Sequence, residues 1–369
     1  MISQAIQRHK HFEEQYANEA VDVIYSLKFT EGVVDKLIGV LCKLGLSTLL
    51  IETKKRTGDL IDLTGDEKRK ALVKLVLTPY GELKEIRKSL LRISNGEDSY
   101  VSRRKDWIKA QNSKNKKKYL DGLSPDEIEE NEFLDLFAEH AYQNMCRRTI
   151  SDGNNLKIKL NVRILQSIGL RTCPYCNAAF IGSRGRGILD AQLDHFMSKS
   201  IYPFFCLCLY NLIPSCATCN NEKSDLDDLG LVSPFDEDAD FEKGIKIDYH
   251  EYEVPVKYVL REKNRKKEYV GFSKMSVRGN LDGELDYQKN IEVFKLQEAY
   301  DFQEENARNY IARMKTYPKS QLEEFSRMHF GSRTQLERDL FTNYFSGYDE
   351  EDRILSKMYK DLYEKHRNN

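Results

Sequence analysis

The chain has 369 residues, which is enough for two domains or for one domain with large extensions. Hydrophobic residues make up 40% of it and aromatic residues 11%, so it can bury a sizeable core, and this composition excludes a disordered protein. Because 58 Lys and Arg stand against 59 Asp and Glu, the net charge of −1 neither favours nor excludes a nucleic-acid partner.

The beginning of the chain, MISQAIQRHKHFEEQY, has no apolar core of a secretory signal. The most apolar window, VVDKLIGVLCKLGLSTLLI (residues 33–51), carries Asp35, Lys36 and Lys43. Charges at these positions favour a buried amphipathic helix over a membrane span. We therefore expect a cytoplasmic protein that does not associate with a membrane.

Apolar periodicity predicts helices through residues 1 to about 100, followed by a basic stretch at residues 102–122. A helix with strong start signals comes next: Ser124 is the expected N-cap, Pro125 the first helical residue, and Glu127 the partner in a capping box. These features define a helical N-terminal region, residues 1–164.

Residues 165–229, called the chemical segment below, contain the candidate metal-binding and catalytic residues. Residues 230–369 are expected to form strands followed by helices. Alternation in KIDYHEYEVPVKYVLREKNRKKEYVGFSKMSV predicts two or three strands with a charged turn at residues 261–268. NIEVFKLQEAYDFQEENARNYIARMKTY predicts one long helix, and DEEDRILSKMYKDLYEKH predicts a further one. The expected fold class is α+β.

Two Cys-x-x-Cys pairs, in RTCPYCNAAF and PSCATCNNEK, predict a structural zinc site formed by Cys173, Cys176, Cys216 and Cys219. Each spacing lets two thiolates reach one ion from a tight turn, and two such turns complete a tetrahedral site. The alternatives are a redox pair or four ordinary buried thiols. Cys206 and Cys208 lie among large apolar residues and are expected to be packing residues.

Between the cysteine pairs, a strand is expected to end in Asp194 and His195, and a second strand or turn contains Asn211. A helix beginning near the second pair contains Asn220 and Lys223. A strand, a strand and a helix, held at the base by zinc, would bring Asp194, His195 and Asn220 within reach of one point.

In these features residues 172–225 resemble HNH endonucleases of the zinc-knuckle type, which have a ββα-metal fold. The ending NNEKSD also resembles the corresponding helix in the HNH domain of RNA-guided CRISPR nucleases. More narrowly, LDHFMSKSIYP, LYNLIPSCATCN and the downstream VFKLQEAY resemble the HNH nuclease subunit of Septu-type bacterial anti-phage defence systems. That resemblance implies a partner protein that is an ATPase.

The chemistry of phosphodiester hydrolysis assigns roles to these residues. Histidine can accept a proton near neutral pH, so His195 is the expected general base. The oxygens of Asp194 and Asn220 are expected to hold one Mg²⁺ or Mn²⁺, and Asn221 is the rival to Asn220. The resemblance implies that Asn211 supports the loop that orients His195.

Nucleic-acid contacts are expected from three groups of cations. Lys223, one turn along the helix from Asn220, and Lys199 lie in the chemical segment. The loop GSRGRG supplies Arg184 and Arg186. Residues 103–118 hold eight Lys or Arg and the only Trp of the chain, Trp107, a composition suited to a phosphate backbone and a stacked base. The candidates there are Arg103, Arg104, Lys116 and Lys117, and the alternative is a solvated linker.

Taken together, the sequence predicts a metal-dependent HNH endonuclease that hydrolyses DNA, with a structural Zn²⁺ and a catalytic Mg²⁺ or Mn²⁺. The resemblance to defence nucleases implies an effector that works with an ATPase. Two alternatives stay open: an HNH nuclease that cuts RNA, and a non-catalytic zinc-knuckle module that binds nucleic acid.

Overall fold

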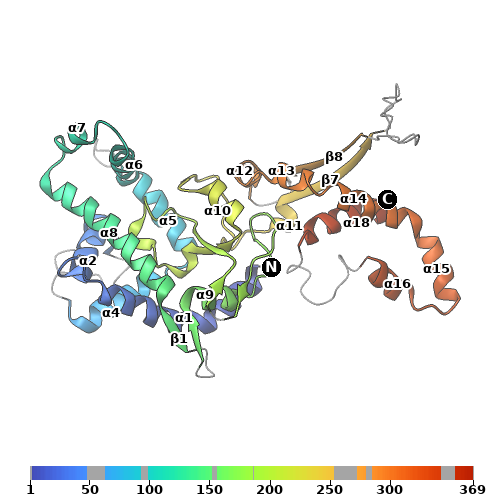
Figure 1. Ribbon diagram of the computed structural model, residues 1–369, viewed down its shortest axis with the longest axis horizontal. Coiled ribbons are helices and arrows are strands. Elements are labelled where there is room, and N and C mark those ends of the chain that lie inside the picture. Colours follow the sequence, from blue (N-terminus) through green and yellow to red (C-terminus); the bar gives the residue numbers. More distant parts are fainter. Residues whose placement is uncertain are drawn as a thin grey trace. The chain divides into compact units, whose positions relative to one another are not determined.

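The computed structural model (Figure 1) describes residues 2–47, 63–92, 99–151, 156–185, 187–252, 272–279, 285–341 and 354–368. The chain forms two compact units. The first contains residues 1–170, 182–228 and 233–237, and the second contains residues 171–181, 229–232 and 238–369. These units cut across the segments 1–164, 165–229 and 230–369 that the sequence suggests.

The first unit begins with helices that bury apolar side chains, except for the short helix Lys116–Leu120, which has no buried residue. They are α1 (Ile2–Ser26), α2 (Val33–Lys43), α4 (Gly65–Val76), α5 (Tyr80–Leu91), α6 (Tyr100–Gln111), α7 (Lys116–Leu120), α8 (Pro125–Arg147) and α9 (Leu160–Ile168). In α2 the buried residues include Val34, Leu37, Ile38 and Leu41, which recur at helical spacing. The apolar window is therefore a buried amphipathic helix over the part that α2 covers, and residues 48–51 lie outside the described residues.

Helix α8 begins as its sequence predicts. Ser124 is the N-cap, its hydroxyl accepts from the backbone N–H of Glu127, and the Glu127 carboxylate accepts from the backbone N–H of Ser124. Pro125 occupies the first helical position. The helix carries Tyr142, whose hydroxyl donates to the carbonyl of Leu193 at 3.3 Å, so α8 runs past the strands that form the candidate site.

Small antiparallel sheets complete the described part of the first unit. Strands β1 (Thr149–Ser151) and β2 (Lys157–Lys159) pair before α9, and β3 (Ser183–Arg184) pairs with β4 (Ile188–Leu189). Strand β5 (Gln192–His195) pairs with β6 (Leu212–Ser215), with Asp194 opposite Ile213 and His195 opposite Leu212. Helix α10 (Ala217–Lys223) follows β6 directly, so the expected order of strand, strand and helix is present.

The loop between β5 and β6 is packed rather than solvated. It contains two short 3₁₀ helices, η2 (Pro203–Phe205) and η3 (Leu209–Asn211). All residues from 193 to 216 are buried except Lys199 and Ser200, which are half-buried. Burial of the large apolar side chains of this loop holds the end of β5 rigidly, because a packed interior resists displacement.

The described residues of the second unit form α11 (Phe241–Gly244), the hairpin strands β7 (Ile245–Tyr252) and β8 (Phe272–Gly279), and six further helices. These helices are α12 (Gln288–Val293), α13 (Leu296–Asp301), α14 (Glu304–Thr316), α15 (Lys319–Arg327), α16 (Arg333–Leu340) and α18 (Ser356–Asn368). The predicted charged turn at 261–268 lies outside the described residues.

One expected helix of the second unit is broken. The prediction of a single long helix at residues 290–317 is wrong, because α12, α13 and α14 divide it. At the first break Lys295 has φ 48° and ψ 48°, a left-handed conformation that cannot continue a right-handed helix. Helices and small antiparallel sheets together make the molecule α+β. Among the described helices, none combines the length and apolarity needed to span a membrane.

Candidate functional site

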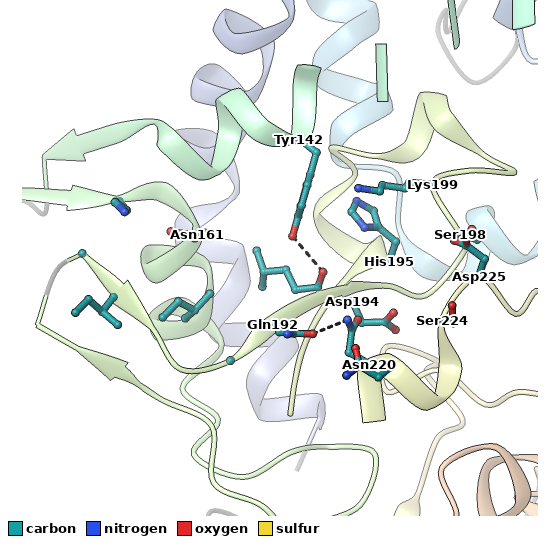
Figure 2. A pocket seen from close by; sticks show the side chains of 17 residues that line it. Tyr142, Asn161, Gln192, Asp194, His195, Ser198, Lys199, Asn220, Ser224 and Asp225 are labelled. Atoms are coloured by element: carbon teal, nitrogen blue, oxygen red, sulfur yellow. Dashed lines mark hydrogen bonds between the residues drawn. The ribbon is translucent and has the colours of Figure 1, made fainter. Parts of the chain in front are cut away.

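Strand β5, helix α10 and segments beside them line a cleft of about 690 Å³ in the first unit. Asp194 and His195 from the end of β5 line it, and Asn220 of α10 lines it with them. Figure 2 shows Gln192, Asp194 and Asn220 in one part of the cleft and Tyr142, His195 and Lys199 in another. The structure therefore brings together the three residues that the sequence predicts to meet.

Asp194 is buried in an ion pair with Lys223. The ammonium of Lys223 donates to Asp194 Oδ1 at 3.0 Å and to the carbonyl oxygen of His195 at 2.7 Å. The Lys223 side chain has no exposed surface, and that of Asp194 is 4% exposed. The prediction that Lys223 contacts a phosphate is wrong for this arrangement, because its ammonium lies inside the protein and supports the end of β5.

His195 is held by a backbone acceptor. Its Nε2 lies 2.9 Å from the carbonyl oxygen of Cys206, and because a carbonyl only accepts, Nε2 carries the proton. In the neutral ring Nδ1 is then the proton acceptor. The ring of Tyr142 meets the imidazole edge to face, with centroids 4.7 Å apart. These contacts fix both the orientation and the tautomer of the imidazole.

The protonation of His195 differs from the expectation of an unperturbed imidazole. Burial, with a smaller contribution from the nearby ammonium groups of Lys199 and Lys223, lowers the pKa of His195 to about 3. The hydrogen bond to Cys206 acts in the other direction. The ring is therefore neutral across the physiological range, which is the form that can accept a proton. An anion beside it would raise this pKa, because negative charge favours the imidazolium.

Asn211 supports the His195 loop. Its Oδ1 accepts from the backbone N–H of Met197 at 2.7 Å. Its Nδ2 donates to the carbonyls of Met197 at 3.0 Å and Phe205 at 3.2 Å. The side chain is buried and ties the residues that follow His195 to the η2 segment. Asn211 orients the loop and its amide is engaged by backbone groups on both sides.

Asn220 is half-buried, and its Nδ2 donates to Gln192 Oε1 at 2.6 Å. That bond sets the direction of the amide, because Nδ2 faces Gln192 and Oδ1 is the end that can act as a ligand. Asp194 and Asn220 offer hard oxygen donors, which suit Mg²⁺ or Mn²⁺. Asn221 also lines the cleft and is exposed.

Several lining residues have no signal in the sequence. Tyr142, Lys159 and Asn161 come from α8, β2 and the first turn of α9, ahead of residues 165–229, and only the tertiary fold brings them to the cleft. Gln192 could have been predicted from the sequence, because it lies two residues before Asp194 on one strand and therefore on the same face.

The cations predicted to contact nucleic acid differ in their exposure to solvent. Lys199 lines the cleft, with its ammonium 4.7 Å from the centroid of the Tyr142 ring. Arg184 is exposed and pairs with Asp190 at 2.9 Å, while Arg186 lies outside the described residues. Arg103 of α6 and the α7 residues Lys116 and Lys117 are exposed. Their contact with nucleic acid stays a prediction.

The prediction that Arg104 and Trp107 contact nucleic acid is wrong. Both are buried, Arg104 at 1% exposure and Trp107 at 2%. Arg104 donates to the carbonyl of Ser200 at 2.9 Å and pairs with Asp135, which also accepts from the indole N–H of Trp107. A phosphate or a base has no access to these groups, so the basic stretch has a packed face as well as a charged one.

Each cysteine pair is presented by a tight turn with N–H groups aimed at sulfur. The backbone N–H of Ala178 donates to Cys176 Sγ at 3.4 Å, and Cys216, the N-cap of α10, accepts from the N–H of Cys219 at 3.4 Å. In the first turn Asn177 has φ 50°, a left-handed conformation that Asn tolerates better than most residues.

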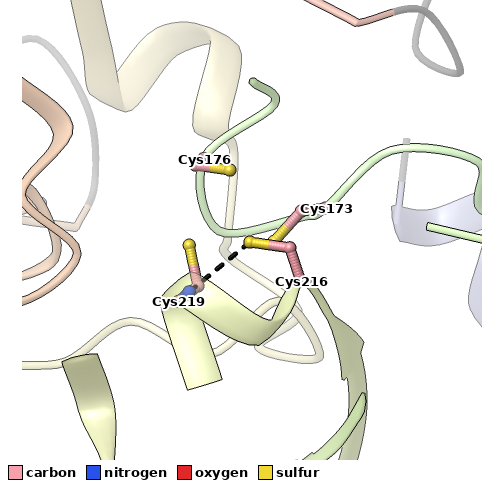
Figure 3. Close-up of side chains that lie close together, drawn as sticks. All are labelled: Cys173, Cys176, Cys216 and Cys219. Atoms are coloured by element: carbon pink, nitrogen blue, oxygen red, sulfur yellow. Dashed lines mark hydrogen bonds between the residues drawn. The ribbon is translucent and has the colours of Figure 1, made fainter. Parts of the chain in front are cut away.

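All four thiols are buried and lie within 4.8 Å of one another (Figure 3). A tetrahedral Zn²⁺ with bonds of about 2.3 Å holds its sulfurs about 3.8 Å apart, so four thiolates gathered this closely fit a zinc ion. Four sulfur ligands also favour zinc over Mg²⁺ or Ca²⁺. Cys206 and Cys208 are buried, and burial raises the pKa of each thiol to about 12, in keeping with packing residues.

No family model, no curated protein and no solved structure matches this chain.

Proposed function

We propose that the protein is a metal-dependent endonuclease of the HNH type that hydrolyses phosphodiester bonds in DNA. The observation that carries the proposal is the geometry of β5, β6 and α10. This unit directs a buried carboxylate, a neutral imidazole with a fixed tautomer and an amide oxygen into one cleft. The resemblance of residues 172–225 to HNH endonucleases adds the reaction class.

In this proposal His195 receives a proton from the attacking water at Nδ1. Its Nε2 keeps its own proton, which it donates in the hydrogen bond to the backbone carbonyl of Cys206. Asn211 keeps the loop after β5 in place, and Lys223 keeps Asp194 and the His195 carbonyl in place. Asp194 and Asn220 would hold Mg²⁺ or Mn²⁺, which when bound supplies stabilisation of the charge that develops on the phosphate. The cysteine cluster would hold Zn²⁺ and fix the start of α10.

The test uses a supercoiled plasmid and a structured RNA, each incubated with the protein and either Mg²⁺ or EDTA. Cleavage of the plasmid only with Mg²⁺ is expected. His195→Ala should lower the rate by about 10²–10⁴-fold, the usual contribution of a general base, without changing the zinc content. Cleavage of RNA alone would favour the RNA nuclease, and binding without cleavage of either substrate would favour the non-catalytic module.

The narrower proposal concerns a defence role. The resemblance to the Septu-type nuclease implies an ATPase that controls where and when the chain cuts. Expression of the tagged chain together with its neighbouring genes should then yield a stable complex with an ATPase. A chain that purifies alone and cuts a defined site efficiently would favour a free-standing nuclease instead.

A further inference from the structure

Part of the cleft is lined by residues to which the proposed reaction gives no role. Lys159 and Asn161 lie at the junction of β2 and α9, and Lys199 lies in the loop after β5. All three line the same cleft as Asp194, His195 and Asn220. Two of the three are cations, so the lining of the cleft can meet negative charge.

The backbone that carries Lys159 is fixed. Lys159 pairs with Thr149 at the end of the β1–β2 hairpin, and the next residue, Leu160, donates its N–H to the carbonyl of Arg148 at 2.9 Å. Ile158, immediately before it, is 2% exposed. The alternation of the strand therefore turns Lys159 outward, and the pairing holds the base of its side chain at the edge of the cleft.

Asn161 and Lys199 are also directed by local contacts. Asn161 Oδ1 accepts from the backbone N–H of Val162 at 2.8 Å, so its amide NH₂ is the end that can donate to an incoming oxygen. The ammonium of Lys199 lies over the Tyr142 ring, the same ring that meets the imidazole of His195. A cation at this position lies beside the proposed general base.

The carboxylates of the cleft have partners of their own. Asp194 accepts from Lys223 at 3.0 Å, and Asp225 accepts from the hydroxyl of Ser198 at 2.9 Å. In the part of the chain that the structure describes, neither Lys159 nor Lys199 forms an ion pair. Both ammonium groups are thus available to an anionic ligand.

We propose that Lys159, Asn161 and Lys199 form a phosphate-binding wall that holds the backbone of a nucleic-acid strand beside the phosphate that is cut. This inference rests on the proposed nuclease function and names the residues that grip its substrate. The cleft volume of about 690 Å³ is that of a site for a ligand of nucleotide size, since ligand sites span about 300–1,000 Å³. Contacts of lysine to phosphates position a strand without reading its sequence.

The hairpin offers a matched control for the test. Lys157 lies two residues before Lys159 on β2, is exposed on the same face and has the same charge, but does not line the cleft. Lys159→Ala and Lys157→Ala remove one surface cation each from the same short strand, so general effects on net charge and folding should be equal. Only the first substitution removes a group from the cleft.

The experiment measures fluorescence anisotropy of a labelled oligonucleotide, duplex or single-stranded, with the full chain, in Ca²⁺ and over a series of salt concentrations. Lys159→Ala should weaken binding several-fold. It should also make the slope of log affinity against log salt shallower by about 0.7–0.9, the effect of losing one phosphate contact. Lys157→Ala should match the wild type in both quantities.

The outcomes separate the two claims. If the wild type binds and Lys159→Ala binds as tightly as the wild type, with the same salt slope, the wall is wrong and the nuclease proposal stands. If Lys159→Ala and Lys157→Ala weaken binding equally, the effect is one of general charge and the wall is again wrong. If the wild type binds neither oligonucleotide, the nuclease proposal fails and the wall with it.

Discussion

At the scale of single residues, the site is organised by two buried charges of opposite sign. Lys223 and Asp194 have almost no exposed surface, and neither charge is stable inside a protein without the other. The sequence predicts Asp194 at the site but not the burial of Lys223, because lysine is almost always exposed. Its partner lies 29 residues away, and only the tertiary fold determines the pairing.

The pair predicts a strong coupling between the two positions. Lys223→Met should destabilise the fold by about 3–5 kcal/mol, because it leaves the Asp194 carboxylate buried without its counter-charge. Asp194→Asn should also destabilise, and the double variant should lose less than the sum of the two single variants. Urea unfolding in the absence of added divalent ions measures all three, and strictly additive losses would contradict the pairing.

His195 predicts a dependence of stability on pH. Its pKa is about 3 in the fold and about 6.5 in an unfolded chain, so between these values the unfolded state binds the extra proton. The contribution of His195 is therefore complete above about pH 6.5 and is lost as the pH falls toward about 3. Unfolding free energies measured at about pH 7 and pH 5 should differ less for His195→Gln than for the wild type. An equal difference would place the acid sensitivity in other groups.

At the scale of elements, prediction succeeded where the signal is local. The capping box of α8 and the strand–strand–helix order of β5, β6 and α10 follow from neighbouring residues. The prediction of a single helix at residues 290–317 failed because Lys295 adopts a left-handed conformation. No glycine stands there to indicate such a conformation in the sequence. The buried face of α6 was not predicted for a different reason. A buried arginine cannot be told from an exposed one in the sequence until the groups that it contacts are known.

Helix α6 predicts contrasting effects of two adjacent arginines. Arg104 donates to the Ser200 carbonyl and pairs with Asp135, so Arg104→Ala should cost about 3 kcal/mol or more. It should also lower cleavage, because Ser198 in the same loop lines the cleft. Arg103→Ala, at an exposed position, should change stability by less than about 0.5 kcal/mol.

The same pair of variants separates folding from nucleic-acid binding. If the exposed cations of α6 and α7 contact phosphates, Arg103→Ala should weaken oligonucleotide binding and make its salt dependence shallower. Thermal melts and anisotropy titrations on both variants give the comparison. A stable Arg104→Ala with weakened binding would reverse the assignment and return Arg104 to the nucleic-acid surface.

At the scale of the whole molecule, the cysteine cluster draws on parts of the chain that are distant in sequence. Its two pairs are separated by the strands and loop that carry Asp194, His195 and Asn211. The spacing of the cysteines predicts the ligand set without any knowledge of this intervening structure, because each Cys-x-x-Cys turn is locally determined. The cleft residues Tyr142, Lys159 and Asn161 show the opposite case, since each comes from a helix or strand with no chemical motif.

A metal held in this cluster should be part of the folding free energy. The purified chain should contain one zinc ion by elemental analysis, and Cys173→Ser or Cys216→Ser should lose it and unfold the surrounding structure. Binding at structural zinc sites contributes about 10–16 kcal/mol, which is as large as the whole stability of an ordinary domain. Cys42→Ser, in α2 and outside the cluster, should keep both zinc and fold, because it removes a thiol without removing a ligand. A well-folded wild-type chain without zinc would contradict the assignment. Loss of zinc from Cys42→Ser as well would mean that the metal is bound nonspecifically by thiols rather than by the four-cysteine cluster.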